Sequence, residues 1–252
     1  VPRPQRPELL AAIQQFGEKG IVVCAPTGKA AVRITEAMQQ YKLPFQATTI
    51  HTALGVLGCD HGDWRFRRCE TLPLEQQLIV IDELSMCDTP LMAAVLAAVP
   101  KGGNVLMIGD PNQLPPVGHG APLRDMIEAR VPTGMLTEIR RNSGAIVEGC
   151  ARIKDGEKPI VYTKGNLEEG KNLVHVDCGM DTKERVAWVA RVLSKIHSDG
   201  VYDRVWDVQV LTATNKARKQ FNEMMQDGLN PMAVGEKQIN PAFRVGDKVI
   251  CL

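Results

Sequence analysis

Three short apolar segments dominate the first half of the chain, and each ends abruptly in polar or glycine-containing residues. They are residues 20–30, 77–84 and 104–114. Short apolar runs of this kind are typical of buried parallel strands. Helical spacing of apolar residues follows in residues 29–40, 89–99 and 121–129. This alternation predicts an α/β fold with a doubly wound parallel sheet.

Polar side chains follow each predicted strand. They lie in residues 26–29, at Asp82 and Glu83, and in residues 109–113. In an open α/β sheet, ligands bind beyond the carboxyl ends of the strands. We therefore expect the three polar clusters to converge on one crevice.

The second half of the chain repeats this pattern. Residues 172–178 and 207–215 have the composition of strands, and helices are predicted at residues 181–198 and 216–226. Asp181 and Glu184 are spaced for a capping box at the start of the first of these helices. A second α/β unit is therefore expected.

The boundary between the two units is predicted within residues 141–171, where glycine and proline interrupt regular elements. We assign residues 1–143 to a first domain and residues 144–252 to a second, with a small hairpin inserted at about residues 59–75.

Composition excludes two classes of protein. Among 252 residues, 44% are hydrophobic and 23% are charged, so the chain is not a disordered tail. No apolar run approaches the roughly 20 residues that span a bilayer, and the first residues lack the apolar stretch of a signal peptide. We expect a cytoplasmic protein without membrane contact. Because the net charge is +1, contact with nucleic acid would depend on a local basic surface.

The seven cysteines are odd in number and irregularly spaced, which predicts reduced thiols. The nearest approach to a zinc cluster is formed by two histidines and two cysteines without the paired short spacings of a structural zinc site. These residues are His51, Cys59, His61 and Cys69. We interpret them as loop and core residues.

Two strand ends carry groups suited to nucleotide chemistry. Asp82 and Glu83 follow an apolar strand, an arrangement with which nucleotide hydrolases hold Mg²⁺ and orient water; capping of a helix is the alternative role. Gln113 lies in a loop stiffened by prolines, where its amide can bond both a γ-phosphate oxygen and an attacking water. A plain proline-rich turn is the alternative for that loop.

Residues 25–30, Ala-Pro-Thr-Gly-Lys-Ala, resemble a phosphate-binding loop but fail its pattern. A P-loop requires Gly-x-x-x-x-Gly-Lys-Ser/Thr, and Val23 and Ala30 occupy the first glycine and the hydroxyl positions. The segment is better suited to meet another phosphate, such as that of a nucleic acid backbone, at a helix N-terminus. A simple strand-to-helix turn is the alternative.

Five segments together, APTGKAAVR, TIHTAL, VIDELSM, IGDPNQLPPVG and LTEIRRNS, resemble superfamily 1B DNA helicases of the RecD and Dda type in order and spacing. The resemblance covers residues 20–143, and more loosely residues 208–230 and 243–252. It implies two RecA-like parallel-sheet domains of the P-loop NTPase class, and the start of an SH3-like insertion at about residue 243.

The resemblance also implies roles for individual residues. Asp82 and Glu83 would be the Walker B pair, with Asp82 on Mg²⁺. Gln113 would sense the γ-phosphate, Asp110 would also bind the nucleotide, and Arg141 would reach ATP across the domain cleft. Arg140 is adjacent and equally charged, so the choice of Arg141 rests on alignment with the family's Arg-Gln pair, which is Arg141-Asn142 in this sequence. Single-stranded DNA would meet residues of both domains, namely Pro26, Thr27, Lys29, Thr49, His51, Thr212, Thr214 and Asn215.

The hairpin segment contains Trp64-Arg65-Phe66-Arg67-Arg68 and lies where related helicases carry a hairpin that splits the duplex. Arg65, Arg67 and Arg68 suit phosphate contact, and the aromatic rings suit base stacking. The alternative is a solvated hairpin packed by Trp64.

The 252 residues contain no Walker A motif and no glutamine-rich final helicase motif. We therefore expect a partial chain that does not hydrolyse ATP efficiently, because the principal holders of the phosphates and Mg²⁺ are missing. The parent activity implied is that of an ATP-dependent helicase, 5′ to 3′ and monomeric, acting on single-stranded DNA and duplex junctions. A degenerate DNA-binding module and an ATPase of the phosphate-starvation type are the alternatives; the latter leaves the TIHTAL and APTGKAA segments unexplained.

Overall fold

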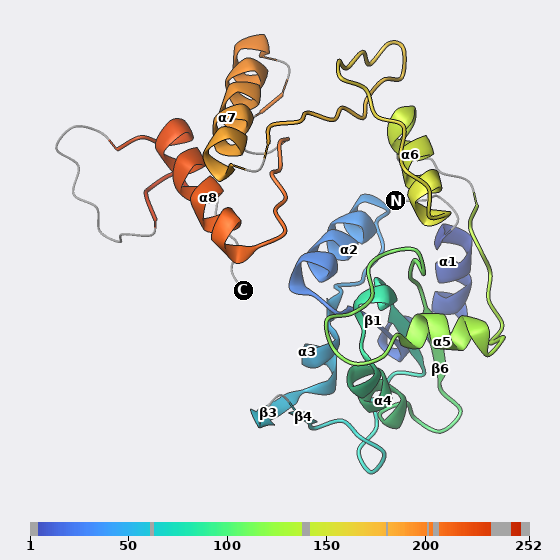
Figure 1. Cartoon of the computed structure of the whole chain (residues 1–252). Helices are drawn as coiled ribbons and strands as arrows, with labels where there is room; N and C mark the ends of the chain where they lie inside the picture. The colour runs from blue at the N-terminus through green and yellow to red at the C-terminus, as the bar shows by residue number, and fades with distance from the viewer. Residues whose placement is uncertain are drawn as a thin grey trace. The chain divides into compact units, whose positions relative to one another are not determined.

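A computed structural model of the chain describes residues 5–60, 63–137, 142–179, 181–200, 202–203, 207–232 and 243–247. The chain divides into two compact units, residues 1–160 and residues 161–252 (Figure 1).

The first unit is built on a parallel sheet of four strands. In sequence order they are β1 (Ile21–Ala25), β2 (Thr48–Thr49), β5 (Leu78–Ile81) and β6 (Asn104–Met107), and their spatial order is β2-β1-β5-β6. All neighbouring pairs are parallel. The three apolar segments therefore form three adjacent strands, as the sequence predicts.

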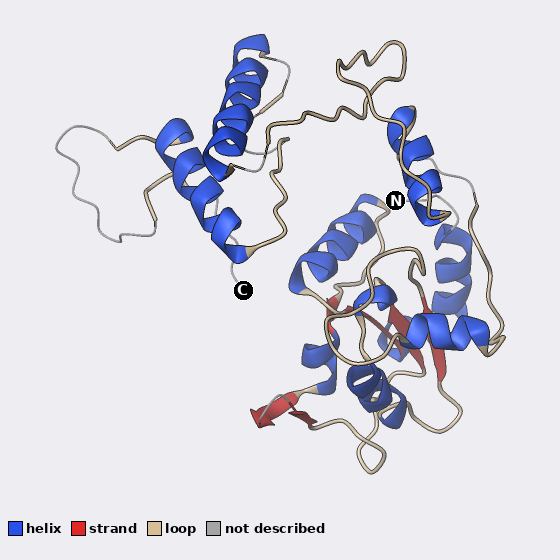
Figure 2. Cartoon of the chain, viewed as in Figure 1, coloured by secondary structure: helices blue, strands red, loops and turns tan. Residues whose placement is uncertain are grey.

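Helices cover both faces of this sheet (Figure 2). Side chains alternate along β1 and β5, so Val23 and Val80 face α1 (Gln5–Phe16) and α2 (Gly28–Gln40). Their sequence neighbours point to the opposite face because the side-chain period of a strand is two. The result is a three-layer α/β/α core.

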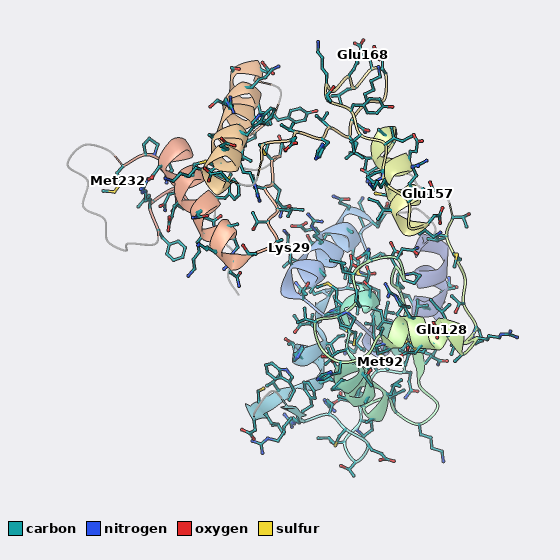
Figure 3. The ribbon with its side chains drawn as sticks, in the orientation of Figure 1. Lys29, Met92, Glu128, Glu157, Glu168 and Met232 are labelled. Atoms are coloured by element: carbon teal, nitrogen blue, oxygen red, sulfur yellow. The ribbon has the colours of Figure 1, made fainter. Side chains whose placement is uncertain are left out.

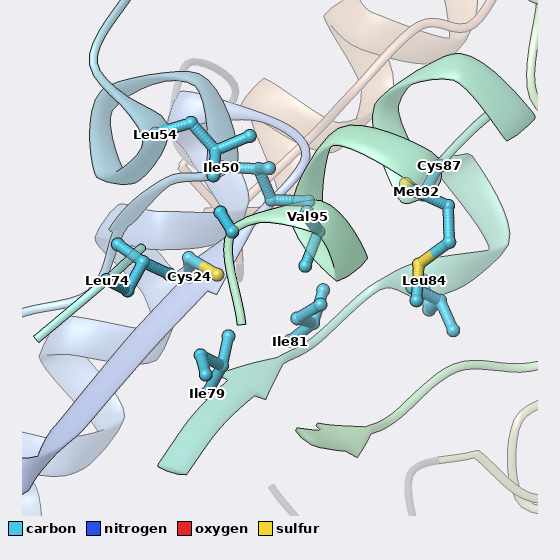
Figure 4. Close-up of a cluster of buried hydrophobic side chains, with 11 residues drawn as sticks. Cys24, Ile50, Leu54, Leu74, Ile79, Ile81, Leu84, Cys87, Met92 and Val95 are labelled. Atoms are coloured by element: carbon cyan, nitrogen blue, oxygen red, sulfur yellow. The ribbon is translucent and has the colours of Figure 1, made fainter. Parts of the chain in front are cut away.

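The opposite face carries the larger of the two core clusters (Figure 4). Here Ile79 and Ile81 of β5 pack against α3 (Ile50–Leu54) and α4 (Thr89–Ala97). Asp88 caps α4 by accepting a hydrogen bond from the Leu91 amide at 3.0 Å. The short helix α5 (Pro122–Glu128) packs against the same cluster, and α6 (Ala145–Lys154) follows in the chain. The predicted helices 29–40, 89–99 and 121–129 are thus confirmed.

Two cysteines of this core give stability a pH dependence. Cys24 and Cys87 are buried, and burial raises the pKa of each thiol to about 12. An unfolded thiol ionises near pH ~8.5. Above that pH the folded thiols keep their protons, whereas the unfolded thiols lose theirs. The stabilising effect of the two buried thiols is therefore complete below pH ~8.5 and is lost as the pH rises toward 12.

We therefore expect the free energy of unfolding in urea, measured under reducing conditions, to fall above pH ~8.5, by at most about 1.4 kcal/mol per pH unit for each thiol. Cys24→Ala should lower stability at pH 7 and flatten the pH dependence. The exposed Cys150 provides the control, since Cys150→Ala should change neither. An unchanged slope in Cys24→Ala would contradict the assignment.

A two-stranded antiparallel hairpin projects beyond α3 (Figure 1). It comprises β3 (Val56–Asp60) and β4 (Asp63–Phe66), with a register irregularity between Val56 and Gly58. The hairpin, predicted at about residues 59–75, therefore lies nearer the N-terminus, at residues 56–66. Residues 67–75 form a loop closed by a bridge between Cys69 and Leu72.

The second unit contains the helices α7 (Thr182–Asp199) and α8 (Asn215–Leu229), which pack on each other and bury Leu193 and Phe221. Both predicted helices are confirmed. Asp181 caps α7 by accepting a hydrogen bond from the Lys183 amide at 2.9 Å.

The prediction of strands at residues 172–178 and 207–215 is wrong for the described residues. Val174 takes part only in an isolated bridge with Tyr162, and Leu211 is 82% exposed. An alternating apolar pattern yields a strand only where a neighbouring strand supplies hydrogen-bond partners. One RecA-like domain is therefore evident, in the first unit, and the expected second parallel sheet is not seen among the described residues.

Most of the predicted SH3-like segment, from about residue 243, lies outside the described residues. Residues 243–247 form a turn with Gly246 at φ 92°. Arg244 binds this turn to α8 by donating to the carbonyl oxygens of Gln226 and Asn230 at 3.4 and 2.9 Å. These carbonyls close the C-terminal end of the helix, where a cation is favourable.

Candidate functional site

The carboxyl ends of the parallel strands place the predicted polar clusters side by side. The Asp82 amide donates to the Cys24 carbonyl at 3.0 Å, and the Ile108 amide donates to the Ile81 carbonyl at 2.8 Å. Residues that follow β1, β5 and β6 therefore meet at one edge of the sheet, as expected for an open α/β fold.

Asp82 and Glu83 form a tight acidic turn after β5. The Glu83 amide donates to Asp82 Oδ1 at 2.8 Å, and Glu83 has φ 56° and ψ 38°. This left-handed conformation costs a non-glycine residue about 1–2 kcal/mol, and such residues cluster at functional sites. Although Glu83 directly precedes the 3₁₀ helix η2 (Leu84–Met86), its side chain makes no capping hydrogen bond. The capping alternative is therefore unsupported for Glu83.

The loop after β6 carries Asp110 and Gln113. Asp110 Oδ1 accepts a hydrogen bond from the Asn112 amide at 2.9 Å, and the Asp110 carbonyl accepts from the Gln113 amide at 3.2 Å. The backbone is held, while the Gln113 side chain is exposed. The loop can therefore present the Gln113 amide to a ligand at the sheet edge.

Arg124 of α5 reaches back to the same loop. Its Nε donates to the Pro111 carbonyl at 3.0 Å, and its Nη2 donates to the Gln113 carbonyl at 3.1 Å. A single side chain thus holds the loop on both sides of Asn112.

The acidic turn and the Gln113 loop are in direct contact. The Leu84 amide donates to the Ile108 carbonyl at 2.9 Å, and a Cβ added at Gly109 would lie 3.1 Å from the Ser85 amide nitrogen. Only a residue without a side chain permits this approach. A small hollow beside this contact is lined by Ser85 of η2, by Asp110 and Gln113 of the loop and by Arg124 of α5, but not by Asp82 or Glu83.

Sequence reasoning missed two residues at this contact, Ser85 and Arg124. Ser85 is 7% exposed, and its Oγ has no hydrogen-bond partner among the described residues. A signal for Arg124 was present in the sequence: it falls in the first turn of a helix, where the macrodipole disfavours a cation. No comparable signal marks Ser85, because its burial follows from the packing of η2.

Thr27 and Thr49 lie at the same sheet edge and cap helices. Thr27 Oγ1 accepts from the Ala30 amide at 3.3 Å, and Thr49 Oγ1 accepts from the Thr52 amide at 3.1 Å. β1 and β2 pair in parallel with Ala25 opposite Thr49, so Pro26 and Lys29 belong to the same edge. Lys29 is exposed in the first turn of α2 (Figure 3).

His51 joins α3 to the hairpin. Its ring lies 4.8 Å from the Trp64 ring in an edge-on arrangement and 5.7 Å from the Phe66 ring. Burial lowers the pKa of His51, although the nearby Asp88 carboxylate acts in the opposite direction. The neutral imidazole therefore serves as part of an aromatic cluster at neutral pH.

The three hairpin arginines have different surroundings. Arg65 pairs with Asp60 at 3.0 Å with both side chains exposed. Arg68 donates to the Pro73 carbonyl and to Glu75 Oε1, each at 2.9 Å, so it holds the loop after β4. Arg67 is exposed.

Three of the remaining predicted site residues belong to the second unit. Thr214 caps α8 in the second unit by accepting from the Ala217 amide at 3.2 Å, Asn215 begins that helix, and Thr212 donates to the Thr214 carbonyl at 3.3 Å. Arg141 lies outside the described residues.

No group of three or more histidine, cysteine or acidic residues suited to a metal ion occurs in the described part of the chain, and His61 falls outside it. Six described cysteines are free thiols. None of the described helices is long and apolar enough to cross a membrane.

Comparison with known proteins identifies the family. Residues 7–174 match the family described as AAA domain. The ATP-dependent RecD2 DNA helicase of Deinococcus radiodurans is 35% identical over 234 residues, which cover 90% of this chain and 29% of that protein. The RecBCD enzyme subunit RecD of Mycolicibacterium smegmatis is 39% identical over 119 residues, covering 43% of this chain and 21% of that protein.

Among solved structures, Bacteroides Pif1 bound to ssDNA is 23% identical, covering 60% of this chain and 40% of that one, with a TM-score of 0.38. The chain spans less than a third of the two curated relatives named above. With the AAA domain match over most of its length, the chain belongs to this AAA domain family and is homologous to the RecD2, RecD and Dda superfamily 1B helicases.

Proposed function

We propose that this chain is part of an ATP-dependent motor that moves on single-stranded DNA and unwinds duplex, in the 5′ to 3′ direction and as a monomer. One observation carries the proposal: the acidic turn and the Gln113 loop share a sheet edge with Thr27, Lys29 and Thr49. The residues proposed to bind ATP and those proposed to bind the DNA phosphate backbone therefore lie along one edge of the same sheet.

On the nucleotide side, Asp82 would hold Mg²⁺, since Oδ1 is used by the Glu83 amide and Oδ2 has no partner among the described residues. Glu83 would orient and deprotonate the attacking water. Gln113 would contact the γ-phosphate, with Asp110 beside it, and Arg141 would act on the transferring phosphoryl group. When bound, Mg²⁺ would neutralise negative charge on the phosphates.

On the DNA side, Pro26, Thr27 and Lys29 at the start of α2, with Thr49 and His51, would face the phosphate backbone. Arg65, Arg67 and Arg68 would extend this surface onto the hairpin. Arg68 would do so with the N–H groups that its bonds to Pro73 and Glu75 leave over. Trp64 is 50% exposed and could stack on a base at a duplex junction.

In the full motor, residues 1–143 would act as the first motor domain and residues 144–252 as part of the second. Thr212, Thr214 and Asn215 at the start of α8 would provide the second grip on the strand. Alternating closure and opening on ATP would exchange the two grips.

A second candidate is a helicase-fold module that binds DNA without hydrolysing ATP. Lys29, exposed in the first turn of α2, suits this module as well as it suits the motor. The turn formed by Asp82 and Glu83, held against the Gln113 loop, favours the motor, since binding alone does not require that arrangement. ATPase measurements on a polypeptide that carries these residues together with a P-loop distinguish the two.

DNA binding can be tested on the 252-residue chain itself. We expect weak binding of a labelled single strand, with affinity that falls as salt rises. Neutralisation of about 3 to 5 phosphates predicts a slope of log K against log salt of about −2 to −3.5. Fluorescence anisotropy at several salt concentrations measures it.

Lys29→Ala should make this slope shallower by about 0.7. The matched control is Lys101→Ala, since Lys101 is exposed in the turn before β6, at the opposite edge of the sheet. Binding that does not respond to salt, or an equal effect of the two substitutions, would contradict the proposed phosphate contacts.

A further inference from the structure

The loop that carries Gln113 has few internal hydrogen bonds. Its described hydrogen bonds from backbone donors between Pro111 and Gln113 both return to Asp110. Pro115 and Pro116 lack amide hydrogens and cannot add to them. The position of Gln113 relative to the acidic turn therefore depends on contacts from outside the loop.

Arg124 makes such a contact through two hydrogen bonds. Its Nε and Nη2 bind the carbonyl oxygens of Pro111 and Gln113. The planar guanidinium presents these donors in a fixed fork, so the two carbonyls are held at a defined separation. Arg124 forms no ion pair with an acidic side chain within the described part of the chain, and its charge is available to strengthen both bonds.

The helix that supplies Arg124 is itself tied to the acidic turn. α5 packs on η2, and Leu123 lies within 2.9 Å of a Cβ built on Gly109. A cation in the first turn of α5 is opposed by the helix macrodipole. The two hydrogen bonds to the loop provide the compensating interaction.

We propose that Arg124 is a positioning residue that holds the Gln113 side chain in register with Asp82 and Glu83 by fixing the loop carbonyls on either side of Asn112. This inference rests on the proposed ATPase function. Arg124 would not touch the nucleotide. It would act only through Gln113. With Arg124 in place the loop has fewer conformations, so the Gln113 amide is already close to the position in which it contacts ATP.

The test compares Arg124→Ala, Gln113→Ala and the double variant in a polypeptide that carries these 252 residues together with a P-loop. Arg124→Ala should lower the DNA-stimulated kcat by about 10-fold, with KM for ATP and the melting temperature little changed. The double variant should match Gln113→Ala alone, because a residue that acts only through Gln113 has no effect once that amide is removed. Arg124→Lys, which keeps the charge but loses the fork, should recover part of the rate.

Arg130→Ala is the matched control. Arg130 follows the same helix, is exposed, and makes no side-chain hydrogen bond with other described residues. It should leave the rate unchanged. Replacement by alanine adds no new strain at its φ of 59°, since both residues carry a Cβ.

Three results would overturn the proposal. If Arg124→Ala leaves kcat unchanged while Gln113→Ala lowers it, Arg124 has no positioning role and the proposed function stands. If the fold-losses in kcat of the two single variants multiply in the double variant, Arg124 acts independently of Gln113. A normal DNA-stimulated rate in Gln113→Ala itself removes the sensor role, and with it both the inference and that part of the proposed function.

Hydrogen exchange on the 252-residue chain gives a readout independent of ATP turnover. The amides of Asn112 and Gln113 should exchange faster in Arg124→Ala than in Arg130→Ala. Equal exchange in the two variants would show that Arg124 does not hold the loop and would overturn the proposal.

Discussion

Glu83→Gln should reduce ATP turnover by about 10²- to 10⁴-fold in a polypeptide that carries these residues and a P-loop, with nucleotide binding retained. The substitution removes the carboxylate proposed to accept the proton of the attacking water. Asp82, the proposed Mg²⁺ ligand, is unchanged. The left-handed backbone at Glu83 is unaffected, since glutamine has the same Cβ and nearly the same volume. Steady-state ATPase assays and titration with a fluorescent nucleotide separate the two effects.

Glu128→Gln is the control for this substitution. Glu128 is an exposed acid at the end of α5, and the same change of charge there should leave turnover and binding unaltered. A near wild-type ATPase rate in Glu83→Gln would exclude Glu83 as the general base. Loss of nucleotide binding together with turnover would instead indicate that the acidic turn has lost its structure.

Gly109→Ala should lower DNA-stimulated turnover by about 10- to 100-fold. The added Cβ would lie 2.9 Å from Leu123 Cδ2 and 3.1 Å from the Ser85 amide nitrogen. The Leu123 methyl group can rotate away, but the Ser85 amide is backbone, so the loop must move off the acidic turn. Overpacking of this kind costs about 1–3 kcal/mol of stability. Urea unfolding and ATPase assays measure the two effects.

Gly134→Ala provides the matched control, because a Cβ at Gly134 meets no atom within 4 Å. It should change neither stability nor turnover. If Gly109→Ala also leaves stability and turnover unchanged, the close approach between the loop and the acidic turn has no functional consequence. The proposed dependence of turnover on the position of Gln113 relative to Asp82 and Glu83 would then be wrong.

Much of the first unit could be predicted because its elements have strong local signals. The runs around Val23, Val80 and Leu106 have the length and apolar content of strands, and all three form neighbouring parallel strands. Val23 and Val80 are buried as expected, whereas Leu106 of β6 is 46% exposed. Parallel pairing then brings their carboxyl ends together, so the shared edge of Asp82, Gln113 and Lys29 follows from the order of the elements.

The second unit could be predicted only in part, for a related reason. The amphipathic periods of α7 and α8 are local properties, and both helices form where expected. Strand formation at residues 172–178 and 207–215 depends on neighbours that the pattern does not specify, and no strand forms there among the described residues.

Hydrophobic period and strand length are local properties, so the sequence predicts the sheet, its helices and the positions of the acidic and glutamine-containing ends. How those ends are held depends on contacts that form only in the folded protein. The left-handed turn at Glu83 and the buried Ser85 hydroxyl, which has no hydrogen-bond partner among the described residues, lie where the segments after β5 and β6 pack together. Arg124 reaches loop carbonyls 11 and 13 residues earlier in the chain, a distance at which no periodic pattern relates one residue to another, so packing alone brings them together.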